Sequence, residues 1–217
     1  MTADPANLRR PRPYTRPDAG SATAIARIHG LLTVQTIVVV LLTINRLSSL
    51  TLGYVAANGF LRWVDFHNLL TLPLISLVSL VLLKNHLEQL AAAAGVRVRA
   101  WLGLVFVLGV YLYGAGYGAH EVTNYLHTRF CASGPADDLC AIVIFNDDSF
   151  SHWVWFAGFV LLNGALLLLQ ADAPLARPLG WGDVAWLALN GLFIAAGIFA
   201  NLAFETIGLD LYIVAAL

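Results

Sequence analysis

Five long apolar stretches dominate this sequence, and they constrain its fold more than any other feature. A stretch of about twenty apolar residues crosses the hydrocarbon core of a bilayer as an α-helix, because in lipid the polar groups of the backbone must bond within the segment. The stretches cover approximately residues 24–44, 67–83, 100–120, 152–169 and 183–204. We therefore predict an all-α fold, a polytopic transmembrane helical bundle of five spans, with residues 23–217 as a single transmembrane domain.

Composition agrees with this fold class. The 217 residues are 59% hydrophobic and 12% charged, whereas a soluble domain is about half apolar and about a quarter charged. The formal net charge of -1 excludes the strongly basic balance of a dedicated nucleic-acid binder. The expected partner is the lipid bilayer, and no nucleic acid.

The two ends of the chain differ from the spans. Residues 1–22 hold four prolines and four arginines with few large apolar side chains, which predicts a disordered tail. The last residues, from Leu211 onward, are apolar but too few to cross a membrane. We expect them to form a short C-terminal stub.

The distribution of Lys and Arg predicts the orientation. Nine of the twelve basic residues fall on one side of the predicted spans, namely Arg9, Arg10, Arg12, Arg16, Arg27, Lys84, Arg97, Arg99 and Arg177. Short cytoplasmic flanks of membrane proteins carry this excess. The sequence therefore predicts a multi-pass protein of the cell membrane with a cytoplasmic N-terminus.

Two segments on the opposite side bear on this orientation. Residues 47–63 are mildly apolar, but a crossing there would invert the charge pattern downstream, so we predict an interfacial or re-entrant segment. Cys131 and Cys140 lie in a predicted extracytoplasmic loop, residues 128–147. A disulfide between them fits an oxidising compartment, and this expectation agrees with the charge rule.

Polar residues cluster at the same side. Charged groups cost at least about 2.5 kcal/mol at the bilayer centre, so they usually face a protein interior, a wet cavity or each other. At 3.6 residues per turn, His120, Asn124 and His127 share one helix face, with Glu121 beside it. Asp148 and His152 are four residues apart and share another face.

The fourth and fifth spans extend the cluster. Asn163 lies eleven residues after His152, and in the fifth span Asn190, Asn201 and Glu205 are separated by eleven and then four residues. Four segments together place these histidines and carboxylates at one boundary: His67, His120, His127, His152, Asp65, Glu121, Asp148 and Glu205.

Imidazoles and carboxylates are ligands for zinc, and for iron or copper. The first hypothesis is therefore a divalent metal held by His120, His127 and His152 with either Asp148 or His67. Asp148, Glu121 and Glu205 are the candidate catalytic carboxylates, the two glutamates as general base or as groups that orient a ligating histidine. A metal-bound hydroxide would make a metal-dependent hydrolase or oxygenase acting on a lipid-like or amphiphilic substrate.

Two alternatives remain open on the sequence. A proton-coupled carrier would use the polar path of Asn163, Asn190, Asn201 and Glu205, and a structural subunit would merely solvate the cluster at the lipid headgroups. The spacing also departs from the HExxH motif of zinc proteases, since Asn124 stands in place of the second histidine.

Gly114 and Gly118 form a small-xxx-small pattern that predicts close helix packing.

Overall fold

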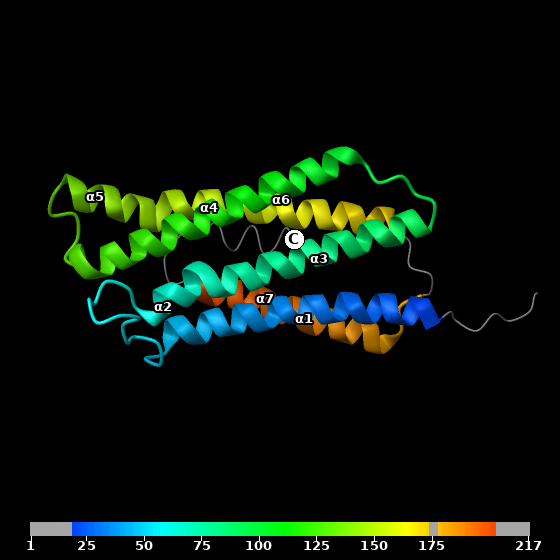
Figure 1. Ribbon diagram of the computed structural model, residues 1–217, viewed down its shortest axis with the longest axis horizontal. Helices are drawn as coiled ribbons and strands as arrows, with labels where there is room; N and C mark the ends of the chain where they lie inside the picture. The colour runs from blue at the N-terminus through cyan, green and yellow to red at the C-terminus, as the bar shows by residue number, and fades with distance from the viewer. Residues whose placement is uncertain (1–18, 174–177, 203–217) are drawn as a thin grey trace, which may run out of the picture.

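The structure, a computed structural model, describes residues 19–173 and 178–202, with side chains described from residue 22 to residue 200. Most of the predicted tail and the whole predicted stub lie outside the described residues. Within them the chain forms an elongated bundle of helices that run side by side along its longest axis (Figure 1).

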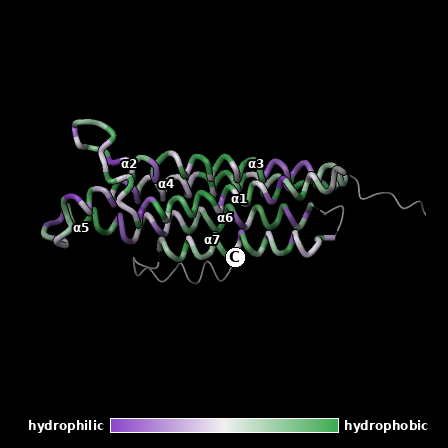
Figure 2. Tube along the Cα trace, turned by 90° about the horizontal axis from the view of Figure 1, so that it is seen from below, coloured by the Kyte–Doolittle hydropathy of each residue, from purple (hydrophilic) through white to green (hydrophobic). Residues whose placement is uncertain are grey.

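The five predicted spans are confirmed as five helical rods long and apolar enough to cross a membrane, with mean hydropathies from 1.6 to 2.0. Hydrophobic residues predominate along them (Figure 2). The elements are α1 (Ala19–Leu47), α2 (Trp63–Phe66), η2 (His67–Thr71), α3 (Leu72–Ala93), α4 (Ala100–Phe130), α5 (Asp138–Phe145), η3 (Asn146–Phe150), α6 (Ser151–Asp172) and α7 (Trp181–Leu202). The elements η2 and η3 are single π-helical turns, so that α2–η2–α3 and α5–η3–α6 are each one continuous rod.

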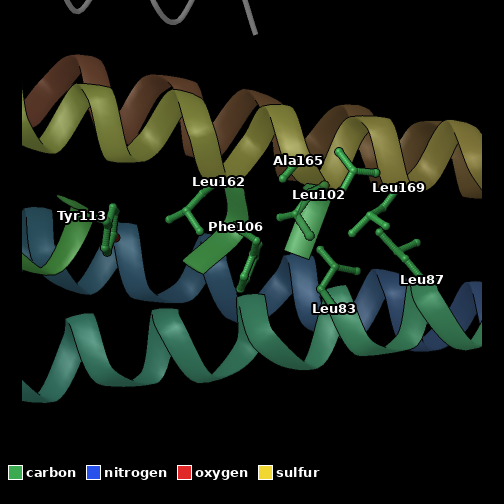
Figure 3. Close-up of a cluster of buried hydrophobic side chains, with 9 residues drawn as sticks. Leu83, Leu87, Leu102, Phe106, Tyr113, Leu162, Ala165 and Leu169 are labelled. Atoms are coloured by element: carbon green, nitrogen blue, oxygen red, sulfur yellow. The ribbon is translucent and has the colours of Figure 1, made fainter. Parts of the chain in front are cut away.

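The rods pack in two groups. The most extensive contact is between α4 and α6, while α1 lies against both α3 and α7. An apolar cluster joins α3, α4 and α6, with Leu83, Leu102 and Leu162 among its buried members (Figure 3). This cluster fixes the relative positions of the three rods, and those rods carry most of the polar side chains described below.

Glycines allow the close approach of α4 and α6. A Cβ added at Gly158 would lie 2.3 Å from the backbone nitrogen of Tyr113, and one at Gly116 would lie 2.6 Å from Trp155. The prediction that Gly114 and Gly118 allow close helix packing was wrong. Among the described residues, nothing lies within 4 Å of a Cβ added at either position. Those two positions face away from α6, a property that the spacing alone does not reveal.

Replacing Gly158 with Ala is expected to destabilise the bundle by about 1–3 kcal/mol, because two backbones must separate to admit the methyl group. Gly164→Ala on the same helix is the matched control, since nothing lies within 4 Å of its added Cβ. Denaturant unfolding in detergent measures both variants. Equal stability of the two would contradict this packing.

One end of the bundle carries the connection between α1 and α2 and the connection between α4 and α5 (Figure 1). It is here called the disulfide end, because Cys131 at the end of α4 is bonded to Cys140 on α5. The predicted disulfide is confirmed, with the two Cα atoms 5.4 Å apart. It closes a short connection, because α4 continues to Phe130 and α5 begins at Asp138, within the segment predicted as a loop. The Asp137 side chain caps α5 by accepting a hydrogen bond from the Cys140 backbone N–H at 2.8 Å.

The connection between α1 and α2, predicted as an interfacial segment, folds back on itself. The backbone N–H groups of Trp63 and Val64 donate to the carbonyl oxygens of Gly53 and Thr51, each at 2.9 Å. The segment therefore leaves and re-enters the bundle at the disulfide end without forming a crossing helix. Within the described residues, this arrangement leaves five helices long and apolar enough to span a membrane.

Candidate functional site

Asp147 is the centre of the polar cluster at the disulfide end. Its side chain is 1% exposed. One carboxylate oxygen accepts from His120 Nδ1 at 2.9 Å, and the other accepts from His127 Nδ1 at 2.8 Å and from Asn124 Nδ2 at 3.4 Å. All three residues of the predicted α4 face thus reach one buried carboxylate.

The π-helical turn η3 explains why Asp147, and not its neighbour Asp148, occupies this centre. The backbone N–H of Ser151 bonds to the carbonyl oxygen of Asn146, five residues earlier, where an α-helix would bond four residues earlier. The extra residue rotates the preceding turn. The residue that shares a helix face with His152 is therefore Asp147, five residues earlier, and not Asp148, four residues earlier. The side chain of Asp148 is consequently 46% exposed, and its carboxylate lies 3.6 Å from His127 Nδ1.

Arg46 joins α1 to the same cluster. Its Nη2 atom lies 2.6 Å from Glu121 Oε1 and 2.8 Å from His120 Nε2. Because a guanidinium only donates, His120 Nε2 must accept, and the ring proton therefore sits on Nδ1 and is donated to Asp147. The contacts hold His120 in one neutral tautomer between a cation and a carboxylate.

His152 completes the buried part of the cluster. It is 2% exposed, and its ring packs edge-on against His120, with centroids 4.7 Å apart. Both histidines, together with Arg46, line a partly open cavity of about 460 Å³. This volume falls within the range of about 300–1,000 Å³ of small-molecule sites.

The cavity runs along the interior of the bundle and is mainly apolar. On α1 its lining extends from Ile25 to Arg46, a helical length of about 30 Å at 1.5 Å per residue. Its uncharged polar lining residues include Gln35, Ser76 and Asn163. A polar cluster and a long apolar cavity therefore share a wall at the disulfide end.

The other predicted site residues lie apart from this centre. His67 bonds through Nδ1 to Thr71 at 3.2 Å and stacks on Trp63. Asn163 donates to the Phe159 carbonyl oxygen of its own helix at 2.8 Å. Asn190 bonds within α7 and accepts from Thr36 at 2.7 Å, whereas the side chains of Asn201 and Glu205 lie outside the described residues.

A second ion pair anchors the rim of the disulfide end. Arg62 donates two hydrogen bonds to Asp65, at 2.8 and 2.7 Å, and its guanidinium lies over the Tyr125 ring. The hydrogen bond to Asp65 raises the pKa of Arg62 above its usual value, against the opposing effect of burial. The pair ties the connection after α1 to α2.

The residues whose geometry suits a metal ion differ from the predicted ligand set and are fewer. Among the described residues one group brings three ligand atoms within 4.8 Å of one another, and it consists of His127, Asp147 and Asp148. The predicted ligands His120 and His152 lie beside this group and not within it. Their imidazoles instead face the cavity.

Two residues of the site were absent from the predicted set. Asp147 has a sequence signal, the Asp147–Asp148 doublet, but helical phase favours the wrong member unless the π turn is known. Arg46 has a weaker signal, as a basic residue at the end of an apolar span on the side that carries few of them.

The fold and the site define an all-α bundle, with five helices able to span a membrane and a buried histidine–carboxylate centre at one end. Comparisons with models of protein families, with curated proteins and with solved structures return no match to this chain. The function is therefore argued from the site itself.

Proposed function

We propose that this protein is a metal-dependent membrane enzyme that binds an amphiphile within the bundle and acts on its polar head at the disulfide end. The observation that carries the proposal is the double role of His120. The ring of this residue lines the cavity, and its Nδ1 atom contacts the buried carboxylate of Asp147 at 2.9 Å. A substrate held in the cavity would therefore present its head to the polar centre.

The charge of the centre favours a divalent cation. Three carboxylates lie at this end, those of Glu121, Asp147 and Asp148, and Arg46 forms its ion pair with Glu121. A divalent ion among His127, Asp147 and Asp148 would be attracted by the two aspartates, and one imidazole with two carboxylates suits zinc or iron. Such an ion would activate a water molecule as a nucleophile next to the head of the substrate.

Metal analysis of the purified protein tests this centre. We expect about one bound zinc or iron ion per chain, lost in His127→Ala and retained in His67→Ala, because His67 bonds to Thr71 away from the group. Elemental analysis after dialysis measures the content. The metal proposal fails if the wild type carries no ion or if both variants retain it.

The orientation is part of the same proposal. The excess of basic residues near the start of α1 and the disulfide at the opposite end both support a disulfide end that faces away from the cytoplasm. We expect a membrane-impermeant thiol reagent to label Cys131 and Cys140 on intact cells after reduction. Labelling that requires lysis would reverse the orientation.

A carrier is the competing function, and the length of the cavity is the observation in its favour, because the lining extends from Ile25 to Arg46. A proton-coupled carrier would need Asn190 as much as the residues of the centre. It would also show gradient-dependent flux in liposomes. Turnover of an amphiphile without a gradient, insensitive to Asn190→Ala, favours the enzyme.

A further inference from the structure

We propose that the cavity selects an amphiphile with an uncharged head and a single apolar chain, and that the Arg46–Glu121 pair sets this selectivity. The inference deepens the proposed function, because it names the substrate class of the same site. It concerns binding alone, and so it can be tested without metal or turnover.

The shape of the cavity favours a single chain. Its volume of about 460 Å³ is spread over a lining that reaches from Ile25 to Arg46, about 30 Å along α1. That length matches the thickness of the hydrocarbon core of a bilayer, about 30 Å. A long and narrow apolar space accommodates one chain more readily than the two chains of a typical membrane lipid.

The charges of the lining favour an uncharged head. Among the described residues that line the cavity, Arg46 is the only Lys, Arg, Asp or Glu. Its charge is compensated by Glu121, which lies 2.6 Å away and is 3% exposed. The head of a ligand at the disulfide end therefore meets a neutral ion pair and the imidazoles of His120 and His152.

A charged head would be costly in this position. A charge removed from water needs a partner of opposite sign. For an anionic head that partner would be the Arg46 guanidinium, which is already paired with Glu121. A cationic head would meet the guanidinium itself. A hydroxyl or ether oxygen, in contrast, needs only a hydrogen-bond donor, and the Arg46 guanidinium carries five N–H donors, of which those on Nη2 are directed at Glu121 and His120.

Three probes with the same oleyl chain test the inference: oleyl glyceryl ether, oleyl sulfate and oleyltrimethylammonium, whose heads are neutral, anionic and cationic. Their binding to the full chain in nanodiscs of zwitterionic lipid is measured by native mass spectrometry in a chelating buffer. For the wild type we expect the neutral probe to bind at least about tenfold more tightly than either charged probe.

Substitutions in the ion pair should change the ranking in opposite directions. Glu121→Gln leaves Arg46 uncompensated and is expected to raise the affinity for oleyl sulfate at least about tenfold relative to the neutral probe. Arg46→Gln leaves Glu121 uncompensated and should favour the cationic probe. Arg46→Lys keeps the charge and should keep the wild-type ranking, and a melting curve for each variant confirms that it is folded.

Three results would overturn the inference. They are a wild type that prefers a charged probe, a Glu121→Gln variant with an unchanged ranking, and a full chain that binds none of the probes. Absence of metal or of turnover would contradict the proposed function and leave this selectivity standing.

Discussion

Asp147→Asn is expected to abolish the proposed metal binding and to lower the free energy of unfolding by about 1–3 kcal/mol, the cost of leaving a buried donor without an acceptor. His120 and His127 both direct Nδ1 at this carboxylate, one at each oxygen. An asparagine offers one oxygen and one NH₂ group, so that one of the two imidazoles must face a donor.

Asp148→Asn is the matched control for the effect on stability alone, because Asp148 belongs to the same proposed metal group. Its side chain is 46% exposed, and its change in stability should stay within about 0.5 kcal/mol. Metal content and denaturant unfolding in detergent are measured on both variants. If Asp148→Asn proved as destabilising as Asp147→Asn, the assignment of the buried carboxylate to Asp147 would be wrong.

Arg46→Met is expected to cost about 3–5 kcal/mol, because it leaves the Glu121 carboxylate buried without its counter-ion. Glu121→Leu should be comparably destabilising, since the guanidinium then loses its carboxylate. The double variant Arg46→Met with Glu121→Leu should recover most of the loss, because neither charge then remains in the interior.

A double-mutant cycle on these three variants measures the coupling. Recovery in the double variant demonstrates the buried pair. Purely additive losses would show instead that Arg46 and Glu121 act independently, and the neutral head-binding end of the cavity would lose its basis.

The long helices could be predicted from the sequence because the signal is physical and local. Any run of about twenty apolar residues has few alternatives to a helix in lipid, and all five predicted runs are helical rods. The shared face of His120, Asn124 and His127 could be predicted for the same reason, because α4 is a regular helix in which helical spacing fixes the direction of each side chain.

The sequence alone could not show which of Asp147 and Asp148 lies on the buried face. Four-residue spacing from His152 points to Asp148, but η3 inserts one residue into the turn and brings Asp147 to the buried face. A π turn depends on how the rod packs against its neighbours, and here it packs against α4. π turns are frequent at functional sites, where they re-aim side chains.

The cavity and the position of Arg46 depend on tertiary structure alone. Arg46 reaches Glu121 across a separation of 75 residues, and only the packing of α1 near α4 creates that contact. The glycines show the same limit: a Cβ added at Gly158 would meet the backbone of Tyr113, whereas among the described residues nothing lies within 4 Å of a Cβ added at Gly114. Residue spacing suggests which side chains share a helix face, but only the packing of the helices determines which faces meet.

X-ray absorption of the zinc-loaded protein tests the metal centre most directly. We predict one imidazole nitrogen, with the remaining ligands being oxygen atoms at about 2.0–2.2 Å, from the group of His127, Asp147 and Asp148 with water. A first shell with three imidazoles would contradict this centre and favour His120, His127 and His152 as ligands. A protein that binds neither zinc nor iron would contradict the metal-dependent enzyme itself.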